Sequence, residues 1–96
     1  MAIPESFISE LKSRVDIEEV IGSYVRLRRQ GSNLVGLCPF HGEKTPSFTV
    51  FTSDQHYYCF GCGAGGDVIT FIRAVENLEY PEAVRFLADR AGMRVT

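Results

Sequence analysis

The 96-residue sequence has few cysteines, no apolar run long enough to cross a membrane and no internal repeat, and each absence excludes a class of protein. An odd count of three cysteines argues against a disulfide framework and fits a reducing compartment. The apolar stretches fall far short of a membrane span, and the N-terminus lacks the apolar segment of a signal peptide. We therefore expect one soluble, cytoplasmic domain, residues 1–96, with no membrane association.

The chain also has little net charge, −2 at pH 7, which is the wrong sign for a strong general nucleic-acid binder. The charges are unevenly distributed, however. Between residues 24 and 53 the cations Arg26, Arg28, Arg29 and Lys44 face one acid, Glu43, while acidic residues concentrate in the flanking segments. The sequence thus predicts a basic middle region between acidic flanks.

All three cysteines belong to two pairs of potential metal ligands. Cys38 and His41 are separated by two residues, as are Cys59 and Cys62, and a glycine follows each pair. Seventeen residues lie between His41 and Cys59, enough for a hairpin that brings the pairs together. Three thiolates and one imidazole on two tight turns are the donor set of one structural, tetrahedral Zn²⁺ site with no position open for water. Such turns also allow backbone N–H groups to hydrogen-bond to the ligand sulfur.

A chain this short buries too little surface to be comfortably stable on its core alone, and a bound metal is a usual remedy. Two other interpretations of the ligand pairs compete with zinc. Cys59 and Cys62 have the spacing of a redox dithiol, although such dithiols usually open a helix whereas this pair follows a strand in a hairpin. His41 as an ordinary core or surface histidine is the second, although it stands at ligand spacing from Cys38.

Two helices are predicted before the middle region from the helical spacing of apolar residues. The first covers residues 4–14. The second follows Asp16, which we expect to cap the helix together with Glu19 in a capping box, and it ends at Gly22.

Two further helices are predicted after it. The third follows a glycine-rich loop, residues 63–67, and ends near Asn77. Such a loop before a helix can bind phosphate, but we expect Asp67 to cap the helix and occupy those donors. The fourth helix starts at Pro81 and ends at Gly92, and residues 93–96 are expected to begin a linker with no partner in the chain.

Between these helix pairs the apolar period changes to two, which predicts a small antiparallel sheet. The expected strands cover residues 24–28, 33–37, 47–52 and 56–60. In the first strand one face is apolar and the other basic. The predicted fold class is therefore α+β: a zinc ribbon, with zinc at one end of the sheet and helices flanking it on the N- and C-terminal sides.

The ligand region resembles the N-terminal zinc-binding domain of bacterial DNA primases, the CHC2-type zinc ribbon. The resemblance rests on residues 38–48, CPFHGEKTPSF, on residues 58–63, YCFGCG, and on Gly66-Asp67. It covers nearly the whole chain, including Asp16-Ile17 and the strand and turn from Val25 to Gly31. Phage primase-helicases carry a related ribbon, generally with four cysteines, so that His41 favours the cellular type.

The resemblance implies a domain that binds single-stranded DNA template and helps to select where an RNA primer starts during DNA replication. In that family a separate RNA polymerase domain holds the catalytic carboxylates and Mg²⁺, and a helicase-binding domain follows. Neither has a counterpart here, so we expect a piece of a longer nucleotidyltransferase that does not synthesise primers alone. The implied partners are the template, the RNA polymerase domain in cis or in trans and, through the parent protein, the replicative helicase.

Single strands are bound by basic grooves with aromatic platforms, because cations contact phosphates and rings stack on bases. The candidates for phosphate contacts are the four cations of the middle region: Arg26, Arg28, Arg29 and Lys44. The candidates for stacking are three aromatic residues: Phe51, Tyr58 and, less directly, Phe60. Phe48 and Tyr57 are expected in the core. The alternative for each arginine is a solvated strand face, and the alternative for the domain is a protein-interaction module that docks through its acidic helices.

Overall fold

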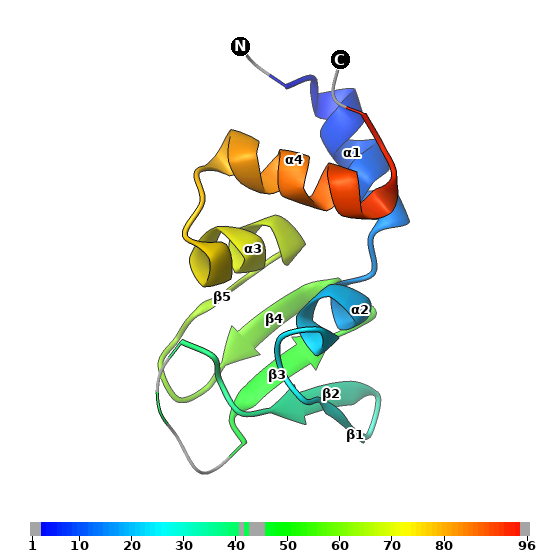
Figure 1. Cartoon of the computed structure of the whole chain (residues 1–96). Coiled ribbons are helices and arrows are strands. Elements are labelled where there is room, and N and C mark those ends of the chain that lie inside the picture. The colour runs from blue at the N-terminus through cyan, green and yellow to red at the C-terminus, as the bar shows by residue number, and fades with distance from the viewer. Residues whose placement is uncertain (1–2, 41, 43–45, 95–96) are drawn as a thin grey trace.

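The computed structural model describes residues 3–40, 42 and 46–94. In these residues the order of elements is α1, α2, β1 to β5, α3 and α4 (Figure 1). The strands form a single antiparallel sheet in sequential order, β1-β2-β3-β4-β5. Helices α1, α3 and α4 lie together at one end of the molecule, and α2 lies beside the sheet (Figure 1). The predicted α+β class, an antiparallel sheet flanked by helices on both sides in sequence, is confirmed.

The four helices lie close to their predicted positions: α1 is Glu5–Arg14, α2 is Ile17–Gly22, α3 is Val68–Glu76 and α4 is Tyr80–Ala91. Asp16 caps α2 as predicted, but its carboxylate accepts a hydrogen bond from the Glu18 N–H at 3.1 Å rather than closing a capping box with Glu19. The capping box of the structure stands instead at α4, where the Glu79 N–H donates to the Glu82 carboxylate at 3.0 Å. None of the helices in the described part of the chain is long and apolar enough to cross a membrane.

At the C-terminal end of the chain, the structure contradicts the expectation that Met93 has no partner. Gly92 ends α4 in the left-handed conformation, at φ 74°, as its position predicts. Met93, expected to have no partner, is only 9% exposed and belongs to the hydrophobic core. Its N–H also donates a hydrogen bond to the Ala88 carbonyl at 2.8 Å. The packed domain therefore includes Met93.

The five strands are β1, Arg28–Gln30; β2, Asn33–Gly36; β3, Phe48–Phe51; β4, His56–Cys59; and β5, Gly65–Gly66. The first strand begins later than predicted because the end of α2 holds the preceding backbone, where the Val25 N–H donates to the Ile21 carbonyl at 2.8 Å. The strand β5 was not predicted, because two glycines carry no side-chain alternation to reveal it. It lies so close to β4 that a Cβ on Gly65 would be 2.9 Å from the Tyr58 ring.

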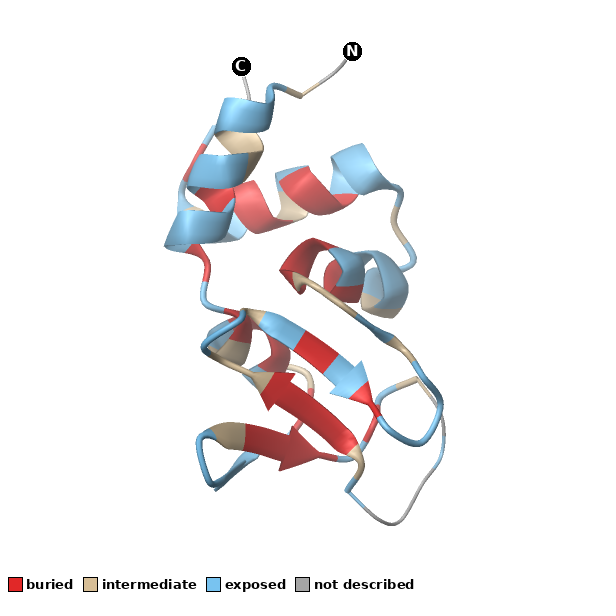
Figure 2. Ribbon diagram, turned by 180° about the vertical axis from the view of Figure 1, so that it is seen from behind, coloured by how far each residue is buried: buried red, intermediate tan, exposed pale blue. Residues whose placement is uncertain are grey.

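One hydrophobic core connects the helices with one face of the sheet, as the buried positions in Figure 2 show. Its centre is aromatic. The Tyr57 ring stacks on Phe48 with ring centroids 5.4 Å apart and meets Phe71 of α3 edge-on at the same distance. Phe40, from the turn after Cys38, completes this cluster against Phe71 at 5.7 Å. The expectation that Phe48 and Tyr57 belong to the core is confirmed, since both are at most 3% exposed.

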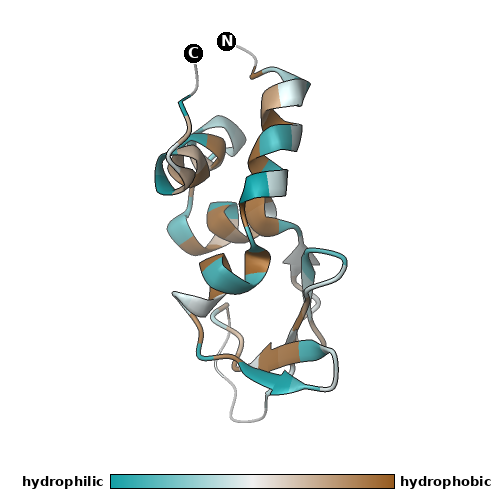
Figure 3. Ribbon diagram, turned by 90° about the vertical axis from the view of Figure 1, so that its right-hand side faces the viewer, coloured by the Kyte–Doolittle hydropathy of each residue, from teal (hydrophilic) through white to brown (hydrophobic). Residues whose placement is uncertain are grey.

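The edge of the sheet has the opposite character. All three residues of β1 are exposed, whereas β2 is mostly buried. Figure 3 shows this contrast as a hydrophilic β1 lying beside a hydrophobic β2. The basic residues at this edge are therefore exposed to solvent. A short, charged edge strand also disfavours pairing with a second chain.

Candidate metal centre and nucleic-acid interface

Three cysteine sulfurs meet at one end of the sheet. Cys38 follows β2, Cys59 ends β4 and Cys62 lies in the turn after it, and their Sγ atoms all lie within 4.8 Å of one another. The Cys38 and Cys62 sulfurs are 3.8 Å apart. A disulfide would require about 2.05 Å, whereas a tetrahedral zinc with Zn–S bonds of about 2.3 Å separates its sulfurs by about 3.8 Å. The donor set and its spacing therefore fit zinc.

His41, the fourth predicted ligand, lies outside the described residues. In the residues just before it, the Phe40 N–H donates to the Cys38 sulfur at 3.4 Å. This is the N–H to sulfur contact that the two-residue spacing predicts. The pKa of the Cys38 thiol is raised to about 12, chiefly by burial; the Phe40 N–H opposes the shift and the neighbouring thiols contribute to it. Cys38 therefore needs a nearby cation to become a thiolate.

The surroundings of the Cys59 thiol shift its pKa in the opposite direction from that of Cys38. Burial raises the pKa of its thiol, but the Ser47 hydroxyl, 3.6 Å from the sulfur, and the N–H groups of Gly61 and Cys62 outweigh it, so that the pKa lies below its ordinary value. The turn after Cys59 closes with Gly63 at φ 82°, a conformation that favours glycine. Because Cys62 lies in a sheet turn, well before α3, the pair does not open a helix as a redox dithiol usually does.

The strand register divides the candidate nucleic-acid residues between two faces of the sheet. Directly paired residues of neighbouring antiparallel strands project from the same face. One such row, followed across four strands, is Arg28, Val35, Thr49 and Tyr58. The adjacent row through Leu34, Val50 and Tyr57 is buried in the hydrophobic core. We call the opposite face, which carries the row from Arg28 to Tyr58, the outer face. Arg28 and Tyr58 at its ends are exposed, whereas Val35 and Thr49 between them are buried, at 8% and 9% exposure.

Arg28, Phe51 and Tyr58 thus share the outer face, since Phe51 lies two residues beyond Thr49 on β3. Arg29 does not share it. Arg29 pairs with Leu34 and so stands at the sheet edge on the side of the core, although its side chain is exposed. Arg26 is exposed just before β1, and Lys44 lies outside the described residues.

An aromatic pair lies at the β4 side of the outer face. Tyr58 is 42% and Phe60 69% exposed, and their rings meet edge-on with centroids 4.9 Å apart. The Phe60 N–H donates to the Ser47 carbonyl at 2.9 Å, which fixes the backbone beside the metal ligands. Phe51 is only partly exposed. Phe60, the least direct of the stacking candidates in the sequence, therefore offers the most accessible ring.

Asp67 caps α3 directly after the glycine-rich loop, as predicted. The Asp67 carboxylate accepts hydrogen bonds from the Thr70 N–H at 2.9 Å and hydroxyl at 3.1 Å. It also pairs with the Lys12 ammonium of α1 at 2.8 Å. Burial raises the pKa of Asp67, but Lys12 and Thr70 together outweigh it and hold that pKa below its ordinary value. The chain's own carboxylate thus takes the place of a bound anion at this helix N-terminus.

Cysteine ligands on two turns at one end of a small antiparallel sheet define a zinc ribbon. The family model described as the CHC2 zinc finger matches residues 3–96, and the chain belongs to this family. The resemblance inferred from the ligand motifs is thereby confirmed.

Individual relatives are DNA primases. The chain is 55% identical over 93 residues to a DNA primase of Pseudomonas aeruginosa, and the aligned region covers 97% of this chain and 14% of that protein. It is 54% identical over 91 residues to a DNA primase of Halalkalibacterium halodurans, at 95% and 15% coverage. The solved structure of the Aquifex aeolicus primase, comprising zinc-binding and RNA polymerase domains, matches with a TM-score of 0.89 and 44% identity, over 100% of this chain and 23% of that one. The chain thus spans only a small part of these relatives.

Proposed function

We propose that the chain is the zinc-binding domain of a DNA primase, and that its outer face binds single-stranded template and helps to select where an RNA primer starts. It acts beside an RNA polymerase domain, in cis or in trans, at the replication fork in the bacterial cytoplasm. The parent protein is the nucleotidyltransferase and reaches the replicative helicase, whereas this domain supplies no catalytic group. Similarity to DNA primases over nearly the whole chain supports this assignment.

The observation that carries the template proposal is the row that joins Arg28 to Tyr58. Three strand spacings separate these residues, about 14 Å at the usual distance between neighbouring strands. A few nucleotides cover that distance, at about 3.4 Å per stacked nucleotide. Arg28 would contact a phosphate at one end of the row, while Tyr58 and Phe60 would stack on bases at the other.

The charge of the domain sets the expected strength of binding. With a net charge of −2 the whole domain does not attract DNA, so affinity depends on the local cations of the outer face. Binding is therefore weak, sensitive to salt and strengthened by the polymerase domain.

One Zn²⁺ held by Cys38, His41, Cys59 and Cys62 is the proposed metal centre. The three clustered sulfurs support it through their donor type and spacing. When bound, zinc supplies a fixed cross-link and no reactive chemistry. Cys38 and Cys59 stand at the ends of β2 and β4, so the cross-link fixes the strands that carry Val35 and Tyr58.

An NMR titration of the zinc-loaded chain with a short single-stranded DNA, at low and moderate salt, tests the proposal. The expected shifts follow the outer face, from Arg26 and Arg28 to Tyr58 and Phe60. Absence of shifts in a folded, zinc-loaded chain would contradict template binding by this domain alone. The protein-interaction hypothesis would then gain, and shifts on the acidic helices with an isolated polymerase domain would support it.

A further inference from the structure

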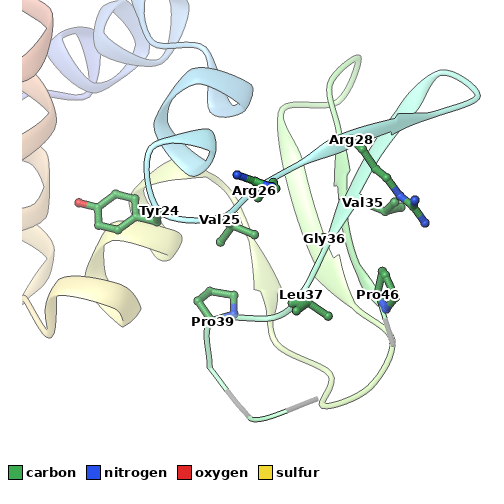
Figure 4. Close-up of a pocket in the computed structure, with 9 residues that line it drawn as sticks. All are labelled: Tyr24, Val25, Arg26, Arg28, Val35, Gly36, Leu37, Pro39 and Pro46. Carbon is green, nitrogen blue, oxygen red and sulfur yellow. The ribbon is translucent and has the colours of Figure 1, made fainter. Parts of the chain in front are cut away.

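A pocket lies where the outer face meets the metal centre. It has a volume of about 370 Å³ and opens between the segment that leads into β1 and the turn that follows β2 (Figure 4). Sites for small molecules usually measure about 300–1,000 Å³. Val35, from the outer-face row, forms part of its wall, and Leu37 and Pro39 flank the metal ligand Cys38. The pocket is therefore built on the metal-bearing turn.

The two sides of the pocket differ in chemistry. Arg26 and Arg28 come from the segment along one side, while Pro39, Leu37 and Pro46 lie along the other (Figure 4). None of the described residues that line it is acidic. A ligand that suits both sides has an apolar, flat body and a negative charge, which is the chemistry of a nucleotide.

The pocket also depends on a close backbone approach. A Cβ at Gly36 would lie 2.6 Å from the Arg26 carbonyl oxygen, so only glycine allows the segment before β1 to lie this close to β2. Val25, from the same segment, is 6% exposed and anchors it in the core. The backbone that frames this side of the pocket is therefore fixed by packing.

Leu37 is an unusual surface residue. It is 47% exposed, and with Tyr58, Phe60 and Tyr80 it makes up the large apolar side chains that are exposed in the described part of the chain. Three of these four lie on the outer face or at the pocket, whereas Tyr80 starts α4. Exposed apolar side chains that gather in one region indicate a binding surface.

We propose that the pocket binds one unstacked nucleotide of the single-stranded template, with its base against Leu37, Pro39 and Pro46 and its phosphates at Arg26 and Arg28. This inference rests on the proposed function, because Arg28 belongs both to the pocket and to the outer-face row. A strand that crosses from Tyr58 towards β1 reaches the pocket at Arg28. Capture of one base there fixes the register of the strand relative to the metal centre.

The test uses the zinc-loaded chain and a short DNA strand of mixed sequence, just long enough to saturate binding, in which each position in turn is made abasic. Loss of one base contact is expected to weaken binding about tenfold. This should occur at the positions that stack on Tyr58 and Phe60 and also at one separate position, that of the nucleotide in the pocket. Leu37→Ala removes part of the apolar wall and leaves the fold intact, because Leu37 is half exposed. In this variant, removing the base of the pocket nucleotide should weaken binding little further, since the two changes remove the same contact.

Tyr80→Ala is the matched control, because it removes a similarly exposed apolar side chain far from the pocket. The proposal is overturned if every abasic position weakens Leu37→Ala as much as it weakens the wild type, or if Leu37→Ala binds the intact strand like the wild type. A second measurement follows the methyl resonances of Val35 and Leu37 by NMR. If free thymidine triphosphate shifts them and the DNA strand does not, the pocket takes a free nucleotide rather than one of the template, and the proposal is overturned. Binding that depends on Arg28 but not on Leu37 would refute the pocket and leave the proposed function standing, whereas absence of any strand binding would refute both.

Discussion

The Gln55 side chain joins the β3–β4 turn to helix α2: its Oε1 accepts a hydrogen bond from the Ile17 N–H at 2.9 Å. Its amide nitrogen donates to the Thr52 carbonyl at 2.8 Å, within its own turn. Gln55 adopts a left-handed conformation, φ 53°, which is uncommon for a residue with a side chain. One side chain thus satisfies a donor at the start of α2 and fixes the turn between the two central strands.

Replacing Gln55 by Ala should lower the free energy of unfolding by about 1–2 kcal/mol, because a helix N-terminal donor and the turn both lose their partner. Urea unfolding of the zinc-loaded chain measures this change. Gln30→Ala, at the exposed end of β1, is the control and should change stability by less than about 0.5 kcal/mol. Equal effects of the two substitutions would show that the Gln55 bridge contributes nothing.

Removal of zinc should unfold the metal end of the sheet, because the ion would cross-link the turns that follow β2 and β4 and metal binding is coupled to folding. Circular dichroism with increasing chelator is expected to show loss of the sheet signal, and an unchanged signal would refute the coupling. Zinc content per chain should fall from one to well below one in Cys62→Ser. His41→Ala tests the fourth ligand in the same measurement, and full zinc retention there would exclude His41.

Features that depend on residues close together in the sequence, such as helix caps and the spacing of the cysteines, were predicted correctly. Asp16 and Asp67 cap the helices that follow them, and Cys38, Cys59 and Cys62 cluster as the spacing of the ligand pairs indicates. The face of Arg29 could not be predicted in this way. Side chains alternate along a strand, so a strand that starts at Arg28 and continues through Arg29 sends these neighbours to opposite faces. The sequence pattern instead predicted a strand that ends at Arg28.

Features that depend on tertiary contact were missed for a related reason. The strand β5 consists of Gly65 and Gly66, and nothing in its composition indicates pairing with β4. The pocket requires the segment before β1 to approach Gly36, a contact between residues ten positions apart that no local periodicity encodes. The exposure of Leu37 was also missed, because the sequence alone places Leu37 in an ordinary strand.

The tyrosines provide a pH test of the helix contacts. The Tyr24 hydroxyl donates to the Glu76 carboxylate at 2.7 Å, and burial, followed by this bond and the carboxylate charge, raises the pKa of Tyr24 to about 12. Burial, with nearby negative groups, also raises the pKa of Tyr57 to about 12. A spectrophotometric titration should therefore show two tyrosines that ionise late. Tyr24→Phe should remove one of them, and an unchanged late phase would refute the assignment.

The same bond predicts how stability depends on pH. Because the pKa of Tyr24 is raised in the folded state, its contribution is fully present below the unfolded value of 10.0 and is lost as the pH rises to about 12. Tyr24→Phe should lower the free energy of unfolding by about 1 kcal/mol near pH 8. The difference from the wild type should shrink above pH 10, and a constant difference would mean that the hydrogen bond is not the cause.

Arg28 and Arg29 are neighbours in sequence on opposite faces of β1, which makes them a matched pair for testing the template surface. Arg28→Ala should weaken binding of a short single strand several-fold and flatten its salt dependence, because one phosphate contact is lost. Arg29→Ala should have a smaller effect, since a strand on the outer face reaches it only by turning around the sheet edge. Arg85→Ala, an exposed charge on α4, controls for net charge and should leave affinity nearly unchanged.

Fluorescence anisotropy at two salt concentrations measures the affinity of all three variants. An Arg29 effect as large as that of Arg28 would mean that the strand wraps the edge of β1 rather than following the row from Arg28 to Tyr58.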